Sequence, residues 1–205
     1  MNIIAVQHTQ AVHHINGMLG GSSDWPLTEL GHSQAKSIAE ALLQELGEKP
    51  DYTLYASDMI RTTQTAEAIS EALGLAIVPV PEIREIKVGS ATGKSRAWMK
   101  ENQTPRAPGE LFLDYRLVPD AETWREMRRR VAVFAERLEA EETNAIVVAH
   151  GGSLAAFTQV FMRLPEDIGE GIWYSGNAGG VHRFEIRQEP DRTVHILKKF
   201  NEILF

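Results

Sequence analysis

The chain has 205 residues, an apolar fraction of 43 % and a formal net charge of −7. Such a length is sufficient for one large domain with a well-buried core. The negative charge argues against non-specific binding to nucleic acid, which needs a basic face, and the lack of cysteine excludes disulfides and thiol catalysis. The sequence shows no bilayer-spanning apolar segment and no signal peptide. We therefore expect a soluble, cytoplasmic protein that binds neither nucleic acid nor a membrane.

The first half of the chain alternates short apolar runs with amphipathic stretches. These patterns predict strands at 1–6, 52–57 and 75–80 and helices at 29–47 and 58–74. Thr28 is a candidate N-cap for the first helix, and Ser57 or Asp58 for the second. Residues 9–27 are rich in Gly, Ser and Asn, so they predict a long loop after the first strand.

The second half begins with a less regular segment. Residues 104–122 contain three prolines, and we expect a surface excursion over 86–120 that includes a short helix at 96–103. The patterns that follow predict helices at 124–142 and 153–164 and strands at 144–150, 179–187 and 193–200. The basic run Arg128-Arg129-Arg130 lies among many acids in a predicted helix, which is typical of a solvated face.

The order of these elements predicts the fold class. Strands that alternate with helices indicate an α/β fold, here a three-layer α/β/α sandwich with a mostly parallel sheet. The last two strands flank a turn and predict an antiparallel hairpin, which makes the central sheet mixed. The sequence shows no repeat, linker or low-complexity segment, so we expect a single domain over residues 1–205.

Two of the predicted strands end in a histidine, at His8 and at His150. If these strands are parallel neighbours, both side chains emerge at the sheet edge where ligands bind in open α/β folds. Gly151-Gly152 then open a helix, whose free backbone N–H groups and positive dipole end suit a phosphate. Arg61, at the start of another predicted helix, can reach the same edge. The pattern favours an anion pocket of two histidines and an arginine.

Motifs spread over most of the chain carry a family resemblance through their order and spacing. They are AVQHTQ, GMLGGSSDWPLTELGHSQA, YASDMIRTTQTAEAI, EIREIKVGSATGKS, PDAETWREMRRRV and VVAHGGSL. The chain resembles the histidine phosphatase superfamily, the phosphoglycerate-mutase-like proteins. The resemblance implies a phosphoric monoester hydrolase that acts through a phosphohistidine and needs no metal or other cofactor.

The resemblance also implies a role for each matching residue. His8 would be the nucleophile, and Glu85 would protonate the leaving oxygen. Arg61 and His150, with the backbone at Gly151, would bind the phosphoryl oxygens. The chemistry of these residue types agrees, because a neutral imidazole is nucleophilic near pH 7 and an alkoxide leaving group needs a proton.

The chain departs from the family pattern at several pocket positions. The residue before the nucleophile is Gln7 where the family has arginine, and the Gly-Arg pair of the loop is Gly17-Met18. A position that usually carries asparagine is His14. Arginine-to-glutamine replacement removes a full charge and a bidentate fork while an amide donor remains. We expect Gln7 and His14 to contact the substrate phosphate in place of the usual side chains.

Three hypotheses account for the missing charge. In the one we favour, His13 or His14 becomes protonated beside the phosphate, or Arg116 or Arg106 of the excursion folds over the pocket. In the second, the substrate carries less charge, or the pocket binds a phosphodiester or another ester. In the third, the protein is a weakly active or inactive relative that binds a phosphorylated ligand or partner.

Further alternatives remain open at the level of sequence. Glu82 competes with Glu85 for the role of the acid. His8, His13, His14 and His150 could converge on zinc, copper or nickel, although no carboxylate is spaced with them in a known ligand pattern, so we expect no metal. A phosphomutase is disfavoured, since the sequence offers no extra basic residues that would retain a phosphorylated product.

The expected partner is a small phosphorylated metabolite, whose identity we expect residues 86–120 to determine. The apolar C-terminus, EILF, is compatible with a homodimer or with packing of the tail against the core.

Overall fold

The computed structural model describes residues 1–205 and contains one six-stranded sheet. The strands are β1 (Asn2–Gln7), β2 (Thr53–Ala56), β3 (Ile77–Pro79), β4 (Ala145–Ala149), β5 (Val181–Gln188) and β6 (Thr193–Glu202). Their order is β3-β2-β4-β1-β5-β6. The first four in this order are parallel, whereas β5 is antiparallel to both β1 and β6. The predicted α/β fold with a mostly parallel, mixed sheet is confirmed.

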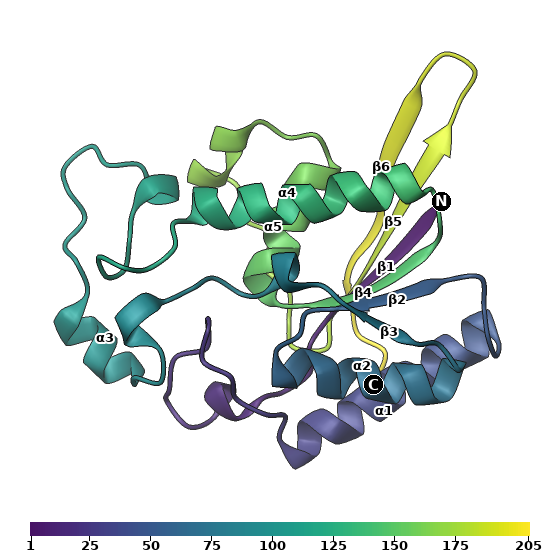
Figure 1. Ribbon diagram of the computed structural model, residues 1–205, viewed down its shortest axis with the longest axis horizontal. Helices are drawn as coiled ribbons and strands as arrows, with labels where there is room; N and C mark the ends of the chain where they lie inside the picture. The colour runs from purple at the N-terminus through teal and green to yellow at the C-terminus, as the bar shows by residue number, and fades with distance from the viewer.

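Helices cover both faces of this sheet (Figure 1). They are α1 (Glu29–Leu46), α2 (Ile60–Leu73), α3 (Arg96–Asn102), α4 (Trp124–Glu141) and α5 (Gly151–Phe161). Helices α1 and α2 pack together below the sheet in the view of Figure 1, and α4 and α5 lie above it. None of the helices combines the length and apolar character that crossing a bilayer requires.

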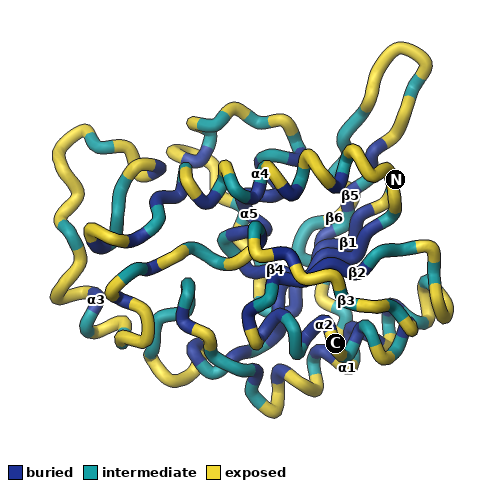
Figure 2. Tube along the Cα trace, in the orientation of Figure 1, coloured by how far each residue is buried: buried dark blue, intermediate teal, exposed yellow.

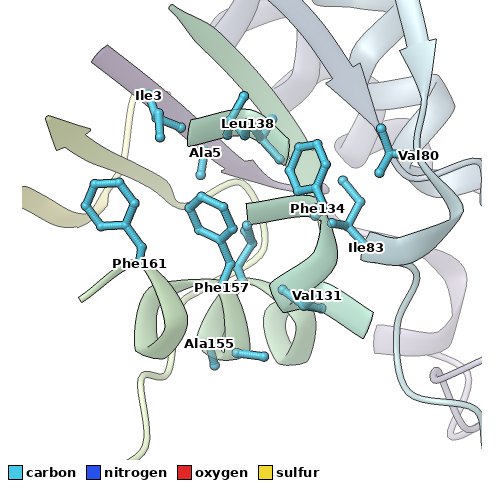
Figure 3. Close-up of a cluster of buried hydrophobic side chains, with 14 of the residues drawn as sticks. Ile3, Ala5, Val80, Ile83, Val131, Phe134, Leu138, Ala155, Phe157 and Phe161 are labelled. Carbon is cyan, nitrogen blue, oxygen red and sulfur yellow. The ribbon is translucent and has the colours of Figure 1, made fainter. Parts of the chain in front are cut away.

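Two apolar clusters fill the space between the layers. A cluster of 21 buried residues lies on the α4–α5 face, and Figure 3 shows Phe134 and Phe157 within it. A cluster of 13 lies on the α1–α2 face, where Leu204 of the C-terminal tail packs against it. Successive residues of β1 alternate between the two, since strand side chains point to opposite faces. Figure 2 shows β1, β2 and β4 as the buried centre of the molecule, whereas the tip of the β5–β6 hairpin is exposed.

The helix starts explain how the pocket elements are oriented. Thr28 caps α1 as predicted, with its Oγ1 accepting the N–H of Gly31 at 3.0 Å. The cap expected for α2 is wrong: neither Ser57 nor Asp58 fills it, because the N-cap is Met59. Asp24 of the preceding long loop instead accepts the N–H of Ile60 at 2.8 Å. The loop thereby becomes attached to the helix that carries Arg61.

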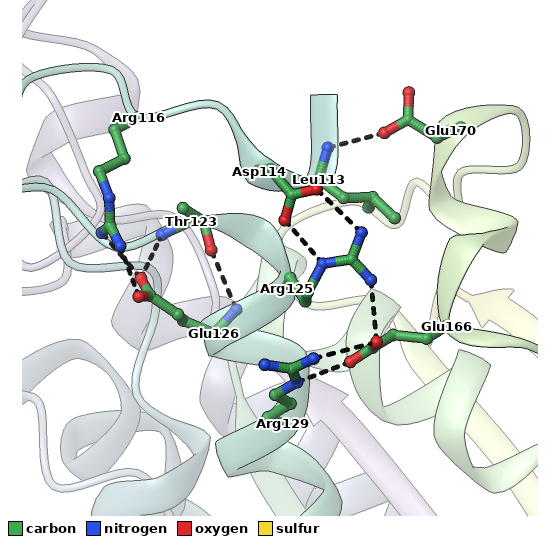
Figure 4. A network of polar contacts seen from close by, with 9 residues as sticks. All are labelled: Leu113, Asp114, Arg116, Thr123, Arg125, Glu126, Arg129, Glu166 and Glu170. Atoms are coloured by element: carbon green, nitrogen blue, oxygen red, sulfur yellow. Dashed lines mark hydrogen bonds and ion pairs between the residues drawn. The ribbon is translucent and has the colours of Figure 1, made fainter. Parts of the chain in front are cut away.

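The excursion of residues 86–120 is bound to α4 by ion pairs (Figure 4). Arg125 of α4 contacts Asp114 of the excursion at 2.6 Å and Glu166 after α5 at 2.8 Å. A small apolar cluster of Val88, Ala91, Met99, Val118 and Ala121 gives the excursion its own core. These contacts fix a long irregular segment beside the ends of the parallel strands.

The solvated face expected for the basic run of α4 is wrong for two of its three residues. Arg129 is largely exposed and pairs with Glu166 (Figure 4). Arg128 donates to the carbonyl of Leu164 at 2.7 Å, and the side chain of Arg130 is only 19 % exposed and pairs with Glu122. A helix of this length presents different faces at successive residues, so a run of like charges need not share one environment.

Candidate active site

His8 and His150 lie side by side at the carboxyl edge of the sheet. Strands β1 and β4 are parallel neighbours, and their last residues, Gln7 and Ala149, are in register. Each histidine directly follows the end of its strand. The His8 N–H donates to the Ala149 carbonyl at 2.9 Å. The two ring centroids are 5.3 Å apart. The convergence predicted from the two strand ends is therefore present.

Arg61 joins the two histidines. It extends from the first turn of α2 and is 1 % exposed. Its Nε–H lies 3.2 Å from His8 Nε2 and 3.1 Å from His150 Nδ1. One guanidinium N–H is thus shared between two imidazole acceptors, in the position where a phosphoryl oxygen would meet all three groups.

The hydrogen-bond partners identify the tautomers of both rings. His8 Nδ1 lies 2.8 Å from the Thr9 carbonyl, which only accepts, so the ring proton is on Nδ1 and the lone pair on Nε2. His150 accepts the Arg61 proton on Nδ1, so its Nε2–H donates to Ser57 Oγ at 2.9 Å. The lone pair of His8 Nε2 therefore faces the pocket, where it accepts the Nε–H of Arg61.

Burial keeps both rings neutral. It is the main cause that lowers the pKa of His8 and of His150 well below the usual value of 6.5, and the Arg61 charge adds to it. A neutral imidazole retains the lone pair that nucleophilic attack requires. Arg61 itself has a pKa lowered by burial, an effect that the negative charges of Glu85 and Asp24 oppose.

The long loop closes over Arg61. Its Nη1 donates to the Ser23 carbonyl at 2.8 Å and its Nη2 to the Gly21 carbonyl at 2.9 Å. His8 is 3 % exposed under this cover. A phosphate that binds through the terminal guanidinium nitrogens must therefore compete with two backbone carbonyls.

Gln7 is buried at the base of the pocket. A Cβ placed on Gly151 would lie 3.3 Å from its Nε2, and one on Gly176 would lie 3.0 Å from its Oε1, so two glycines provide the space for this side chain. Its buried Oε1 has no hydrogen-bond partner. The structure brings Gln7 to the start of α5, where the usual arginine would place a charge.

His13 and His14 also lie beside His8. The His14 ring is stacked on His8 with centroids 5.5 Å apart, and His13 lies 5.8 Å from His8. Burial is the main cause that lowers the pKa of both, that of His13 to about 3. The pair is therefore close enough to compensate for the missing arginines, but the lowered pKa values oppose the protonation that compensation by charge would need.

The tautomer of His14 determines what it can offer. Its Nδ1 accepts the N–H of Ala11 at 3.1 Å, so the ring proton lies on Nε2. His14 is thereby prepared as a hydrogen-bond donor without any added proton. Compensation through hydrogen bonding rather than through charge fits these contacts.

The same tautomer bears on the metal hypothesis. His8, His13 and His14 each offer a ligand atom within 4.8 Å of the others, whereas His150 is not part of this group. A metal needs an imidazole lone pair, and the one on His14 Nδ1 is already engaged by the N–H of Ala11. The histidines converge, but His14 does not fit a metal ligand in this arrangement.

Glu85 lies on the other side of the pocket, at the start of α5. Its Oε2 accepts the N–H of Gly152 and its Oε1 accepts that of Ile86, both at 2.9 Å. Glu82 is turned to Arg137 of α4, 3.0 Å away. Of the two competing acids, the structure brings only Glu85 to the helix start that follows His150.

The excursion supplies no replacement cation through Arg116. Its guanidinium binds Glu126 at 2.5 and 2.8 Å, beside the N-terminus of α4. The hypothesis that Arg116 folds over the pocket is therefore not supported by its contacts. Arg106, the other arginine considered for this role, makes no hydrogen bond or ion pair with the pocket residues.

Three residues with a clear place around the site were missed by sequence reasoning. Ser57 holds the His150 tautomer, although we assigned it to a helix cap. The Ser23 carbonyl holds Arg61, and Arg130 contacts the backbone of Glu85. Ser57 stands next to Asp58 in a family motif, which was the one signal available for it.

Comparison of the sequence with known proteins finds relatives that match most of the chain. The sequence profile of the "Histidine phosphatase superfamily (branch 1)" matches residues 3–197. A relative from Hydrogenobacter thermophilus, named "Putative phosphoserine phosphatase 2", is 32 % identical over 94 % of this chain and 93 % of its own. Another from Yersinia enterocolitica, named "Probable phosphoglycerate mutase GpmB", is 28 % identical over 80 % of this chain and 76 % of its own.

Solved structures show the same fold at lower identity. A mycobacterial glucosyl-3-phosphoglycerate phosphatase superposes with a TM-score of 0.79 at 22 % identity and covers 98 % of both chains. The α-ribazole phosphatase of Shigella flexneri gives 0.79 at 19 % identity, over 98 % of this chain and 96 % of its own.

Proposed function

Because the chain belongs to the histidine phosphatase superfamily, we propose that it is a phosphoric monoester hydrolase that works through a phosphohistidine at His8. The observation that carries the proposal is the shared Nε–H of Arg61, which lies between the lone pairs of His8 Nε2 and His150 Nδ1. A phosphoryl group that enters there meets a neutral nucleophile, a cation and the start of a helix.

The first half-reaction forms a nitrogen–phosphorus bond. His8 Nε2 attacks phosphorus while the bond to the substrate alcohol breaks, and Glu85 gives its proton to the leaving oxygen. Arg61 turns its Nε–H from the imidazoles to a phosphoryl oxygen and stabilises the charge in transfer. Since both Glu85 oxygens accept backbone N–H groups at rest, proton donation requires one of them to leave its partner.

The second half-reaction restores the enzyme. Glu85 takes a proton from a water molecule, whose oxygen attacks the phosphohistidine, and inorganic phosphate leaves with the His8 lone pair restored. The N–H of Gly151 holds a phosphoryl oxygen throughout, and His14 adds its Nε2–H. His150 joins them when its Nδ1 gains a proton, because that atom is an acceptor at rest. Gln7 contributes one neutral amide donor at the position where the family pattern has the charged guanidinium of an arginine.

The direct test is to trap the intermediate. Brief incubation with a phosphomonoester, acid-free quenching and mass spectrometry are expected to find one phosphoryl group on His8. The H8A variant should lose both the phosphopeptide and turnover, whereas H32A, a substitution on the exposed face of α1, should retain both. Unchanged turnover in H8A would exclude His8 as the nucleophile.

A second candidate function rests on the contacts of Arg61 and Gln7. The terminal nitrogens of Arg61 are engaged by loop carbonyls, and Gln7 carries no charge. These features favour a weakly active or inactive relative that binds a phosphorylated ligand. Tight binding of a phosphate ester without any phosphohistidine would select this alternative, and transfer of phosphate between two positions of a substrate would select a phosphomutase.

The substrate is proposed to be a small phosphorylated metabolite with a polar alcohol part. A cleft of about 420 Å³ beside Glu85 is lined almost entirely by polar residues: Ser22, Asp24, Asp58, Met59, Arg84, Glu85, Lys87, Gly89, Thr92 and Asp120. A panel of phosphoserine, sugar phosphates and nucleoside monophosphates tests this. A cytoplasmic location and a homodimer remain predictions.

A further inference from the structure

We propose that Arg130 of α4 is the positioning residue for the acid Glu85, and that it acts through hydrogen bonds to the backbone around Glu85. The inference rests on the proposed function, since it presumes that Glu85 protonates the leaving group. It assigns a role to a member of the basic run that otherwise has no part in the reaction.

Every N–H of the Arg130 guanidinium has an acceptor. Nη1 donates to the carbonyls of Glu82 and Arg84, both at 2.7 Å, and Nη2 donates to the carbonyl of Glu85 at 3.0 Å. The remaining two N–H groups bind the carboxylate of Glu122 at 2.7 and 2.8 Å. The five donors of a guanidinium are therefore all used, and three of them hold the same short segment of chain.

Glu122 holds the segment from its other end. Its Oε2 also accepts the N–H of Lys87 at 3.0 Å. The side chains of Arg130 and Glu122 are 19 % and 8 % exposed, so solvent has little access to the pair. Residues 82–87 are thus bound on both sides of Glu85 by one ion pair, which we name the Arg130–Glu122 clamp.

The clamp matters because this segment has no regular structure of its own. A short 3₁₀ turn ends at Ile83 and the next begins at Gly89, and no strand partner lies between them. The Glu85 carboxylate otherwise depends on the N–H groups of Gly152 and Ile86. A group that must donate a proton within hydrogen-bond distance of a leaving oxygen loses efficiency when its backbone can shift.

Arg130 also acts electrostatically on His150, and the test must separate this effect from positioning. Its charge is a minor cause of the lowered pKa of His150, after burial, Arg61 and His8. Lysine retains that charge but presents a single ammonium group in place of the planar fork. R130K therefore removes most of the clamp while the charge stays.

The test uses the dependence of rate on the leaving group. p-Nitrophenyl phosphate needs little protonation of its leaving oxygen, whereas an alkyl phosphate depends on it. For R130K and R130A we expect kcat on the alkyl substrate to fall about 10- to 100-fold, with a much smaller fall on p-nitrophenyl phosphate. The matched control is R129K, the adjacent residue of α4, which pairs with Glu166 and does not touch the segment; both of its rates should be unchanged.

Folding is controlled by a second variant and a melting curve. If R130A unfolds, the charge-neutral pair R130M/E122Q leaves no unpaired buried charge and is measured instead. Its alkyl rate should be as low as that of R130K. Equal losses on both substrates in folded variants would overturn the positioning role, as would full activity of R130K on the alkyl phosphate.

E85Q distinguishes a failure of the clamp from a failure of the proposed function. If E85Q shows the selective loss on alkyl phosphate and R130K does not, Glu85 is the acid and the clamp is wrong. If E85Q shows no selective loss, the acid is misassigned, and the clamp, which presumes it, is overturned as well.

Discussion

Arg61 donates its Nε–H to His8 Nε2 at 3.2 Å, which places a buried cation directly on the lone pair that we propose as the nucleophile. The same contact holds the His8 ring in place before substrate arrives, and it must break when the lone pair attacks. Because Arg61 is fully buried and bound to loop carbonyls, the long loop and the nucleophile are linked through a single side chain.

R61K is expected to reduce kcat by about 100-fold or more, which is the range for loss of one preorganised donor in a buried site. Lysine keeps the charge but cannot place one N–H between two rings while it also binds the loop. Steady-state kinetics with a generic phosphomonoester measure the loss. R192K, which alters an exposed arginine in the turn between β5 and β6, is the matched control and should behave as wild type. A wild-type kcat in R61K would contradict the role.

His14 is expected to bind phosphate as a neutral donor. H14F keeps a ring stacked on His8 but removes the Nε2–H, so KM should rise about fivefold, the value of one ordinary hydrogen bond. H14N restores a side-chain donor and should largely recover KM. Equal KM values for wild type and H14F, measured above pH 7, would remove His14 from the phosphate site.

The central part of the site could be predicted because it follows from topology. Parallel strands share a carboxyl edge, so two strands that end in His8 and His150 had to converge once they were neighbours. The start of a predicted helix indicated Arg61, and the family resemblance added Glu85; the structure places both around that edge. The terminal hairpin, and with it the mixed sheet, followed from two predicted strands that flank a short turn.

The predictions that were wrong or incomplete concern contacts between residues that are distant in the sequence. The start of α2 is capped by Asp24, which is 36 residues away from Ile60, so local cap preferences favoured the wrong residues. Arg130 contacts backbone 45 residues away at Glu85, and nothing in the run of arginines distinguishes it from its neighbours. Whether His13 and His14 carry charge depends on burial, which the loop sequence does not reveal.

Q7R is expected to strengthen phosphate binding, because it restores a cation at the start of α5. A charge-assisted hydrogen bond is about twice as strong as a neutral one, so the inhibition constant of inorganic phosphate should fall about fivefold. Q188R adds the same charge at the exposed end of β5 and should leave the constant unchanged. Weaker inhibition in a folded Q7R protein would indicate that Gly151 and Gly176 leave too little room for the larger side chain.

The buried histidines predict that stability falls in mild acid. Burial lowers the pKa of His8 and His150 well below 6.5, that of His13 to about 3 and that of His182 to about 4. Below pH 6.5 the unfolded chain binds protons that the folded protein excludes, so the free energy of unfolding decreases as pH falls. Each histidine that stays neutral costs up to about 1.4 kcal/mol per pH unit.

Urea denaturation between pH 7.5 and 5 measures this slope. H182Q removes one of the excluded protons outside the phosphate pocket, so its stability should depend less steeply on pH than that of wild type. H32Q, at the exposed start of α1, should leave the slope as it is. A free energy of unfolding that is constant from pH 7.5 to 5 would mean that these imidazoles accept protons in the folded state, and a neutral His8 nucleophile would then be untenable at the acid end of that range.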